Sequence, residues 1–274
     1  MGTEKIPTIE LSYPFGNLAL AKRLELAEAL DVHAFGEVWM RRNPDGNGAV
    51  LEIGGGQAAF AGVGSPLSHA VGVGMSGPVT EADFEQLEQF FLDRGTPCTI
   101  DLCPLADPSL AEHLGRKGYR ITEFNNVLVR PITPEYHYQN EGVGQANNAR
   151  AWARTVAGGF FERTEFTQEE LELGALFFHL PVGTPWIAKS GEEPAAAACL
   201  MIQERLALLA GDSTLPSFRR QGWHAALIQA RLAYAARQGC DLATASTLPG
   251  SGSQANYERL GFRVVYTKVI MSRE

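Results

Sequence analysis

The chain has 274 residues, of which 45% are apolar and 20% charged, as expected of a globular protein with a sizeable core. A formal charge of −8 disfavours non-specific attraction to nucleic acids and anionic membranes, so we expect neither as a partner and favour a cationic acceptor. The four cysteines form no CxxC pair and have no close histidine partner, which argues against a zinc site and a disulfide framework.

The first half of the chain has the periodicities of a mixed α/β unit. Thr80 and Asp83 form a TxxD helix start, and glycines punctuate the other segments. The expected elements are a helix over 17–38, a turn at NPDGNG that opens a hairpin, strands over 49–60 and 68–75, a helix from Thr80 to near Gly95, a strand at CTIDLCP, a helix over 108–117 and a strand pair in YRITEFNNVLVRPI.

The segment TPEYHYQNEGVG loses periodicity and gathers turn formers, which predicts a linker over 133–144 between units at 1–132 and 145–274. Thr167 and Glu170 form a capping box in the second unit. The expected elements there are a helix over 146–158, a helix from Thr167, strands at TPWIAKSG, AAAACLMIQ and RLALLAGDSTLP, a helix over 219–238, a strand at CDLATASTL, a helix to Leu260 and a strand at FRVVYTKVIM.

The segment FRRQGWHAALI, residues 218–228, follows a strand and opens a helix. Unpaired amides and the helix dipole make such a start an anion site, and Gly222 lets the chain approach bulky phosphate oxygens. Arg219 and Arg220 add charged donors at the rim. Taken alone, the segment could equally be a solvated basic loop that caps a helix.

Further along, NYERLGF at 256–262 lies on a short helix that leads into a strand. Together with FRRQGWH at this spacing, it resembles the GNAT superfamily of acyl-CoA-dependent N-acetyltransferases over about 141–274. The resemblance implies an α/β (α+β) fold with a mostly antiparallel mixed sheet flanked by helices, and acetyl-CoA as acyl donor. It also implies a pyrophosphate turn and pantetheine contacts made by the following residues: Ser213, Thr214, Arg219, Arg220, Gln221, Gly222, Trp223, His224, Ala225, Ser253 and Asn256.

By the same resemblance, Tyr257 corresponds to the tyrosine that protonates the departing CoA thiolate; the alternative is a core aromatic. Asp212 or Glu204 could activate the amine through water, although Asp212 could instead stabilise a strand bulge and Glu204 occupy a hairpin turn. We favour Asp212. His224 stands where the family has a small residue, so its ring must turn away from the phosphates or contact them, and Gly250 stands where the family has asparagine.

The segment LAEHLGRKGY in the first half echoes NYERLGF, aligning Leu114 with Tyr257 and Gly118 with Gly261. The first half is therefore interpreted as a degenerate copy of the same fold. Its equivalent of the diphosphate turn, MSGPVTEADF, has acidic residues and no arginine, so an anion would be repelled there. We expect this copy to lack CoA and activity, and the glycines of IGGGQ and VGVGM to be strand bends or bulges without a ligand.

These observations predict two tandem GNAT-like domains, of which the second, 145–274, transfers an acetyl group from acetyl-CoA to a primary amine of a small molecule by direct attack in a ternary complex. The alternative is a non-catalytic acyl-CoA-binding sensor or pseudoenzyme, and a third interpretation is a scaffold without ligand. A homodimer is a possible assembly. No apolar stretch reaches the ~18 to 20 residues that span a bilayer, and MGTEKIPTIELSYP lacks the layout of a secretory signal, so we expect a cytoplasmic protein without metal.

Overall fold

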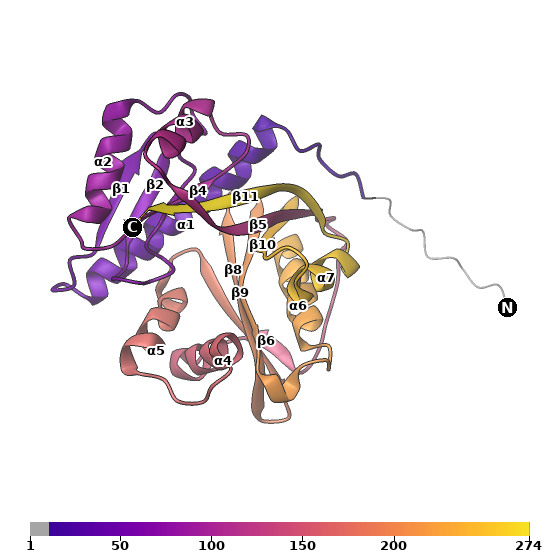
Figure 1. Cartoon of the computed structure of the whole chain (residues 1–274). Helices are drawn as coiled ribbons and strands as arrows, with labels where there is room; N and C mark the ends of the chain where they lie inside the picture. Colours follow the sequence, from indigo (N-terminus) through magenta and orange to yellow (C-terminus); the bar gives the residue numbers. More distant parts are fainter. Residues whose placement is uncertain (1–10, 274) are drawn as a thin grey trace.

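The computed structural model describes residues 11–273, which form a single 11-stranded sheet in the order β1-β2-β3-β4-β11-β5-β10-β9-β8-β7-β6. Helices flank both faces of this mixed sheet (Figure 1). The α/β class expected from the sequence is confirmed. The first ten residues, which hold most of the segment used to argue against a secretory signal, lie outside the described part.

The N-terminal half supplies the first strands of the sheet. Asn17 caps the first helix through the amide of Leu20, and the capping box expected at Thr80 and Asp83 is present. The elements are α1 (Leu18–Arg42), β1 (Ala49–Ile53), β2 (Gly56–Phe60), β3 (Ala70–Val71), α2 (Glu81–Leu92), β4 (Cys98–Leu102), α3 (Pro108–Arg116) and β5 (Arg120–Pro131).

The C-terminal half contains the longer antiparallel strands. The capping box at Thr167 and Glu170 is present as expected, and Ser251 caps the last helix. The elements are β6 (Val143–Gln145), α4 (Ala149–Phe161), α5 (Gln168–Ala175), the 3₁₀ turn η1 (Leu176–His179), β7 (Gly183–Ser190), β8 (Glu193–Gln203), β9 (Leu206–Thr214), the 3₁₀ turn η2 (Pro216–Phe218), α6 (Trp223–Arg237), β10 (Leu242–Thr247), α7 (Gly252–Arg259) and β11 (Arg263–Arg273).

The two halves exchange their last strands at the centre of the sheet. β5, from the N-terminal half, lies between β10 and β11, whereas β11, the last strand of the chain, lies between β4 and β5. In each half a parallel pair precedes the exchange, β3 with β4 and β9 with β10. Figure 1 shows β11 running beside β5 among elements of the first half. The division at 133–144 stays a prediction about folding units, since hydrogen-bonded strands cross it.

Three segments differ from their predictions. Residues 49–60 form a hairpin rather than one strand, because Gly54 and Gly55 both have positive φ and make the turn between β1 and β2. NPDGNG instead joins α1 to β1. Only Ala70–Val71 of the expected strand at 68–75 is extended, and β5 is one continuous 12-residue strand rather than a pair.

The helices form two layers, one on each face of the sheet. Residues of α1, α4, α5 and η1 share one large apolar cluster that also includes Val127 and Val129 of β5. On the other face, α2 and α3 cover the N-terminal strands, and α6 and α7 cover the C-terminal strands. The first layer thus brings helix α1 of the N-terminal half against the C-terminal half. Within residues 11–273, no helix combines the length and apolarity that crossing a membrane requires.

Main-chain geometry supports the expected correspondence between α3 and α7. The amide of Tyr119 donates to the carbonyl of Leu114 at 3.0 Å, and the amide of Phe262 donates to the carbonyl of Tyr257 at the same distance. Gly118 and Gly261 follow the two helices with φ of 76° and 83°. The same helix end therefore occurs at the positions that the sequence aligned.

Candidate functional site

Strands β9 and β10 separate partway along their length. Their parallel pairing covers only Leu206–Leu208 against Leu242–Thr244, while β9 continues along β8 to Thr214. A register shift in the β8–β9 ladder lies opposite Gly211, whose φ is 65°, so the strand bulges there. Beyond the bulge, the edge of β9 that faces away from β8 has no strand partner among the described residues. Such an edge can pair with an extended ligand.

A cleft of about 640 Å³ lies along this open edge. Its walls come from the end of α4, the end of β9, the loop before α6, the first turn of α6, and α7. The residues of the predicted site that line it are Asp212, Ser213, Thr214, Arg219, Arg220, Gly222, Trp223, His224, Ala225, Ser253 and Asn256. The fold thus brings together nearly all the predicted residues.

The first turn of α6 presents uncapped amides to the cleft. Gly222 is the N-cap residue, with φ of 87° and no side chain to satisfy the amides that follow. Arg220 also has positive φ and is exposed, whereas Arg219 is held by Glu162 at 2.7 Å and by the carbonyl of Gly159 at 3.0 Å. The 15-residue helix directs its positive dipole end at the same point. This arrangement suits a phosphorylated ligand.

A buried polar network lies beneath the cleft around Asp212. One carboxylate oxygen accepts a hydrogen bond of 2.6 Å from the Tyr257 hydroxyl, and the other accepts from the Arg231 guanidinium. His224 Nε2 lies 3.4 Å from the same oxygen as Arg231. Arg231 is fully buried and also donates to the carbonyl of Cys199 at 2.7 Å, next to the bulge. The network fixes β9, α6 and α7 relative to one another.

The network sets the protonation states of Asp212 and Tyr257. Burial alone would raise the pKa of Asp212, but the charge of Arg231, the adjacent His224 ring and the hydrogen bond from Tyr257 outweigh it and lower this pKa to about 2. Burial and the neighbouring Asp212 carboxylate raise the pKa of Tyr257 well above its ordinary value. At neutral pH, Asp212 is therefore a carboxylate of low basicity and Tyr257 a protonated phenol.

The His224 ring turns away from the loop, one of the two orientations allowed by the sequence. Its Nδ1 lies 2.8 Å from the side-chain nitrogen of Asn256, and the ring packs edge-on against Tyr257 at 5.6 Å between centroids. His224 is nevertheless among the residues that line the cleft. A large residue is thus accommodated where the resemblance implied a small one.

Three other expected residues lie elsewhere. Tyr257 is 1% exposed and reaches the cleft only through Asp212. Gln221 is absent from the lining, and its side chain donates to the carbonyl of Ser217 at 3.2 Å. Glu204 is exposed in the β8–β9 turn with φ of 54°. It therefore occupies the hairpin turn that the sequence offered as the alternative to a role in activating the amine. Ser213 contributes main chain, since its hydroxyl donates to the carbonyl of Val156 at 2.7 Å.

Sequence reasoning missed Arg231. A signal was present, because Leu227, Arg231 and Ala235 recur at intervals of one helical turn on the buried side of α6. A charged residue in an apolar stripe requires a buried partner. Which carboxylate supplies it depends on how β9 and α6 pack, and no local pattern contains that information.

The equivalent position in the N-terminal half lacks this arrangement. At the start of α2, the Thr80 hydroxyl accepts a hydrogen bond from the amide of Asp83, and Asp83 in turn caps the amide of Thr80. Glu81 forms an ion pair with Arg116 at 2.7 Å. Leu114, aligned with Tyr257, is fully buried. The side chains of Thr80 and Asp83 therefore cap this helix start, and the absence of an anion site in the first half stays a prediction.

The comparisons with known proteins agree with this geometry. Residues 149–262 match the family model described as "Acetyltransferase (GNAT) family". No curated protein matches the chain. Among solved structures, a GCN5-related N-acetyltransferase from Kribbella flavida superposes with a TM-score of 0.59 at 22% identity, covering 89% of this chain and 94% of its own.

Two further structures are similar over most of the chain. A tandem GNAT protein from the clavulanic acid biosynthesis pathway, solved without AcCoA, has a TM-score of 0.59 at 14% identity and covers 97% of this chain and 98% of its own. A GCN5-related N-acetyltransferase from Sphaerobacter thermophilus has a TM-score of 0.54 at 15% identity, covering 75% and 71%. Residues 149–262 therefore match the acetyltransferase (GNAT) family model, and the chain shares its overall fold with these solved structures, one of them a tandem GNAT protein.

Proposed function

We propose that this protein transfers an acetyl group from acetyl-CoA to a primary amine of a small molecule within a ternary complex. The observation that carries the proposal is the uncapped start of α6 beside the open edge of β9, in a segment of the GNAT family. The first half, with its acidic start of α2, is proposed to bind no CoA.

Different residues of the cleft would bind the pyrophosphate and the pantetheine arm of acetyl-CoA. The amides of the first turn of α6, together with Arg220, would bind the pyrophosphate. The open edge at Ser213 and Thr214 would pair with the amides of the pantetheine arm. Ser253 and Asn256 on α7 lie on the opposite wall.

The reaction forms one bond and breaks another. The neutral amine attacks the thioester carbonyl, a carbon–nitrogen bond forms, the carbon–sulfur bond breaks, and CoA leaves as a thiolate. The nitrogen releases its extra proton to solvent, and solvent returns a proton to the tyrosine that protonates the thiolate. We assign the proton for this thiolate to Tyr257, whose raised pKa keeps its hydroxyl protonated at neutral pH. Asp212 orients that hydroxyl through its hydrogen bond. With a pKa of about 2, Asp212 is poorly suited to take a proton from the amine.

Release of the CoA thiol tests this assignment. Purified protein with acetyl-CoA and a panel of small amines should release free thiol in an amine-dependent manner. Tyr257→Phe should lower the turnover number severalfold while the affinity for acetyl-CoA remains, because the phenyl ring fills the same space. Tyr234→Phe, on α6 but packed against Trp186 away from the cleft, is the matched control. Equal turnover of both variants would refute the role of Tyr257.

One observation favours a second candidate, a non-catalytic acyl-CoA-binding sensor. The Tyr257 hydroxyl is buried and donates to Asp212 rather than into the cleft. A sensor would bind acetyl-CoA and release no thiol with any amine. A cytoplasmic location, a homodimer and the lack of nucleic-acid and membrane partners stay predictions from the sequence.

A further inference from the structure

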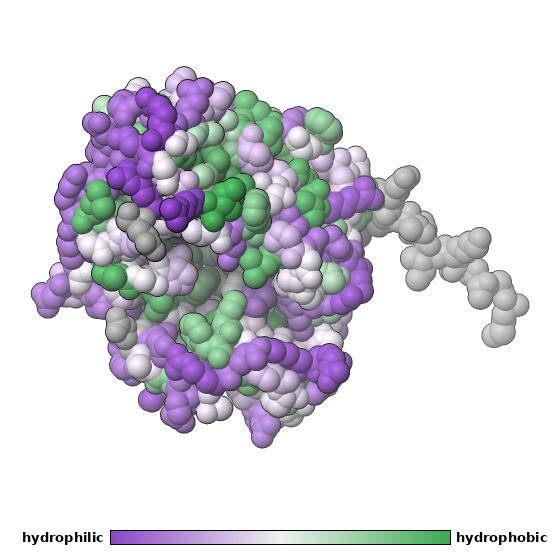
Figure 2. All heavy atoms as spheres, viewed as in Figure 1, coloured by the Kyte–Doolittle hydropathy of each residue, from purple (hydrophilic) through white to green (hydrophobic). Residues whose placement is uncertain are grey.

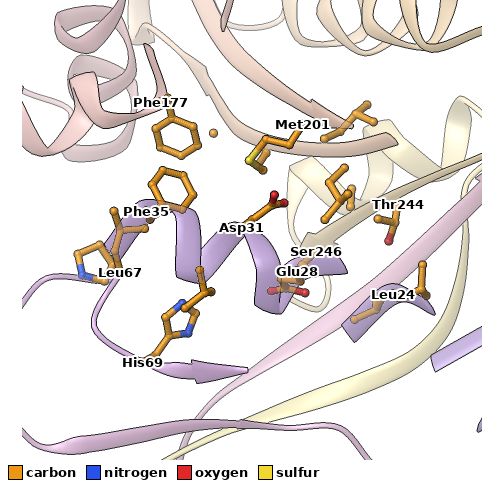
Figure 3. Close-up of a pocket in the computed structure, with 18 residues that line it drawn as sticks. Leu24, Glu28, Asp31, Phe35, Leu67, His69, Phe177, Met201, Thr244 and Ser246 are labelled. Atoms are coloured by element: carbon orange, nitrogen blue, oxygen red, sulfur yellow. The ribbon is translucent and has the colours of Figure 1, made fainter. Parts of the chain in front are cut away.

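A second cavity, of about 290 Å³, lies between helix α1 of the N-terminal half and the strands of the C-terminal half. Figure 3 shows Phe35 and Asp31 on α1 facing Phe177 and Met201 from the C-terminal half. The Phe35 and Phe177 rings meet edge to face at 4.7 Å. The surface is hollowed between the two halves, with apolar residues at the border (Figure 2). The walls are thus mainly apolar and come from both halves.

Asp31 is the exceptional residue in this cavity. Its residue exposure is 3%, and Oδ1 accepts a hydrogen bond of 2.8 Å from the side chain of Gln203. Oδ2 is buried and has no hydrogen-bond partner among the described residues. A buried carboxylate oxygen without a donor is costly, so a water, an ion or a ligand is expected to supply one.

The other buried acids nearby already have a cation. Lys268 lies 3.5 Å from Glu25, 2.7 Å from Glu28 and 3.7 Å from Asp101. His69, which also lines the cavity, is engaged with Asp101 at 3.0 Å. Within residues 11–273, Asp31 has no ion-pair partner, only the neutral amide of Gln203. The unmet requirement is therefore for a positively charged donor.

The cavity and the cleft are lined by neighbouring residues of β9, where this strand separates from β10. Gly211 lines the cavity and the next residue, Asp212, lines the cleft. Thr244 and Ser246 of β10 also line the cavity. A thioester at the inner end of the cleft would therefore lie next to a molecule in the cavity.

We propose that this cavity is the acceptor site and that Asp31 Oδ2 receives the N–H of a compact amine with an apolar body. The inference rests on the proposed function, since it names the acceptor of that reaction. A volume of about 290 Å³ is about ten times the share of one water molecule, room for a small arylalkyl amine. Phe35 and Phe177 would contact its apolar part, and Glu28 would disfavour an acceptor that carries a carboxylate. The N-terminal half thus contributes the recognition residue.

The ionisation of Asp31 agrees with such a ligand. Burial, opposed by the hydrogen bond from Gln203 and assisted by the charge of Glu28, raises the pKa of Asp31 to about 7. An ammonium ion at Oδ2 would lower this pKa and stabilise the carboxylate, and it would lose one proton before the neutral amine attacks the thioester. Glu28 and His69 are the other titratable groups that line the cavity.

The test uses full-length protein saturated with CoA and phenethylamine as the probe, titrated by calorimetry at about pH 8. The neutral isostere 2-phenylethanol should bind at least tenfold more weakly to the unchanged protein. Asp31→Asn should weaken phenethylamine binding about 10- to 100-fold, the factor that corresponds to a charge-assisted hydrogen bond. Glu37→Gln, an exposed acid on the same helix, is the control and should change nothing.

Equal affinities for phenethylamine and 2-phenylethanol, no measurable binding of phenethylamine, or unchanged binding to Asp31→Asn would each overturn the inference. Comparison of the two probes needs no variant, so it holds even if Asp31→Asn fails to fold. Binding of acetyl-CoA to Asp31→Asn should match the unchanged protein, because Asp31 is outside the cleft. If phenethylamine binds through Asp31 but no amine ever releases thiol, the proposed function fails and the cavity assignment does not.

Discussion

The Tyr257 hydroxyl and the Asp212 carboxylate are joined by a hydrogen bond of 2.6 Å beneath the cleft. Arg231 neutralises Asp212 from the opposite side, so the carboxylate stays ionised and the phenol stays protonated. The pair connects α7, which carries Tyr257, to the bulged strand β9, which carries Asp212. A change that breaks the ion pair of Arg231 with Asp212 should therefore affect both the stability of the fold and the shape of the cleft.

Arg231→Met should destabilise the protein by about 3 to 5 kcal/mol, because it leaves a buried carboxylate without its cation. The carbonyl of Cys199 loses its donor as well. Urea unfolding followed by circular dichroism measures the change. Asp212→Asn combined with Arg231→Met should cost less than Arg231→Met alone, since no buried charge is then left unpaired. Arg237→Met, exposed on the same helix, should have little effect, and an equally large loss there would contradict this explanation.

Ala225→Glu should abolish or strongly weaken acetyl-CoA binding without destabilising the protein. Ala225 lies in the first turn of α6, where an added carboxylate interacts favourably with the helix dipole but repels a diphosphate. Ala225→Gln adds the same bulk without the charge, so it separates steric from electrostatic effects. Calorimetry should show at least a tenfold greater loss of affinity for the Glu variant, and equal losses would argue against a pyrophosphate at this turn.

The exchanged strands predict that neither half folds alone. A fragment of residues 141–274 lacks β5, so β10 and β11 lose the strand that lies between them. Separate expression should give proteins without a cooperative unfolding transition, whereas coexpression of 1–140 with 141–274 should give a complex that unfolds cooperatively. A cooperatively unfolding, monomeric 141–274 fragment would show that the exchange is dispensable.

Asp31 should also make stability depend on pH. Its pKa of about 7 in the folded protein exceeds the ordinary value of 3.8, so the folded state holds this proton more tightly than the unfolded chain. The stabilisation that protonated Asp31 contributes to the folded state is fully present below about pH 4 and is lost as the pH rises through about 7. Glu25, whose pKa burial raises to about 7 despite the opposing charge of Lys268, contributes in the same direction.

Asp31→Asn removes the Asp31 part of this dependence. Relative to the unchanged protein, the variant should gain stability between about pH 4 and pH 8, on the order of a few kcal/mol at 1.4 kcal/mol per pKa unit. Urea unfolding at the two pH values measures it. A stability difference between variant and unchanged protein that is the same at both pH values would show that Asp31 is ionised in the folded state throughout the range.

The sequence predicted the parts of the fold and site that depend on local patterns. Gly222 and the residues around it mark a turn and a helix start in eleven consecutive letters, and Thr80 with Asp83 marks a helix start by their spacing alone. Tyr257 was found because NYERLGF, together with FRRQGWH at its spacing, resembles the GNAT superfamily. At both helix starts the physical cause lies within a few residues of the signal.

What the sequence did not reveal depends on contacts distant in the chain. β11 pairs with β4 although more than half of the sequence separates the two strands, and only the assembled sheet shows this exchange. Arg231 and Asp31 look like ordinary helical residues until β9 and β8 bring Asp212 and Gln203 against them. The burial of these charges is a tertiary property, and the pKa values that follow from it are invisible to spacing rules.

Transfer of an isotopically labelled acetyl group tests the central claim most directly. The protein is incubated with acetyl-CoA labelled in the acetyl carbons and a panel of compact primary amines, and the products are analysed by mass spectrometry. The proposed transferase should produce a labelled N-acetyl amine in equal amount to the free CoA. Binding of acetyl-CoA with no labelled amine, or with the label only in acetate, would contradict it.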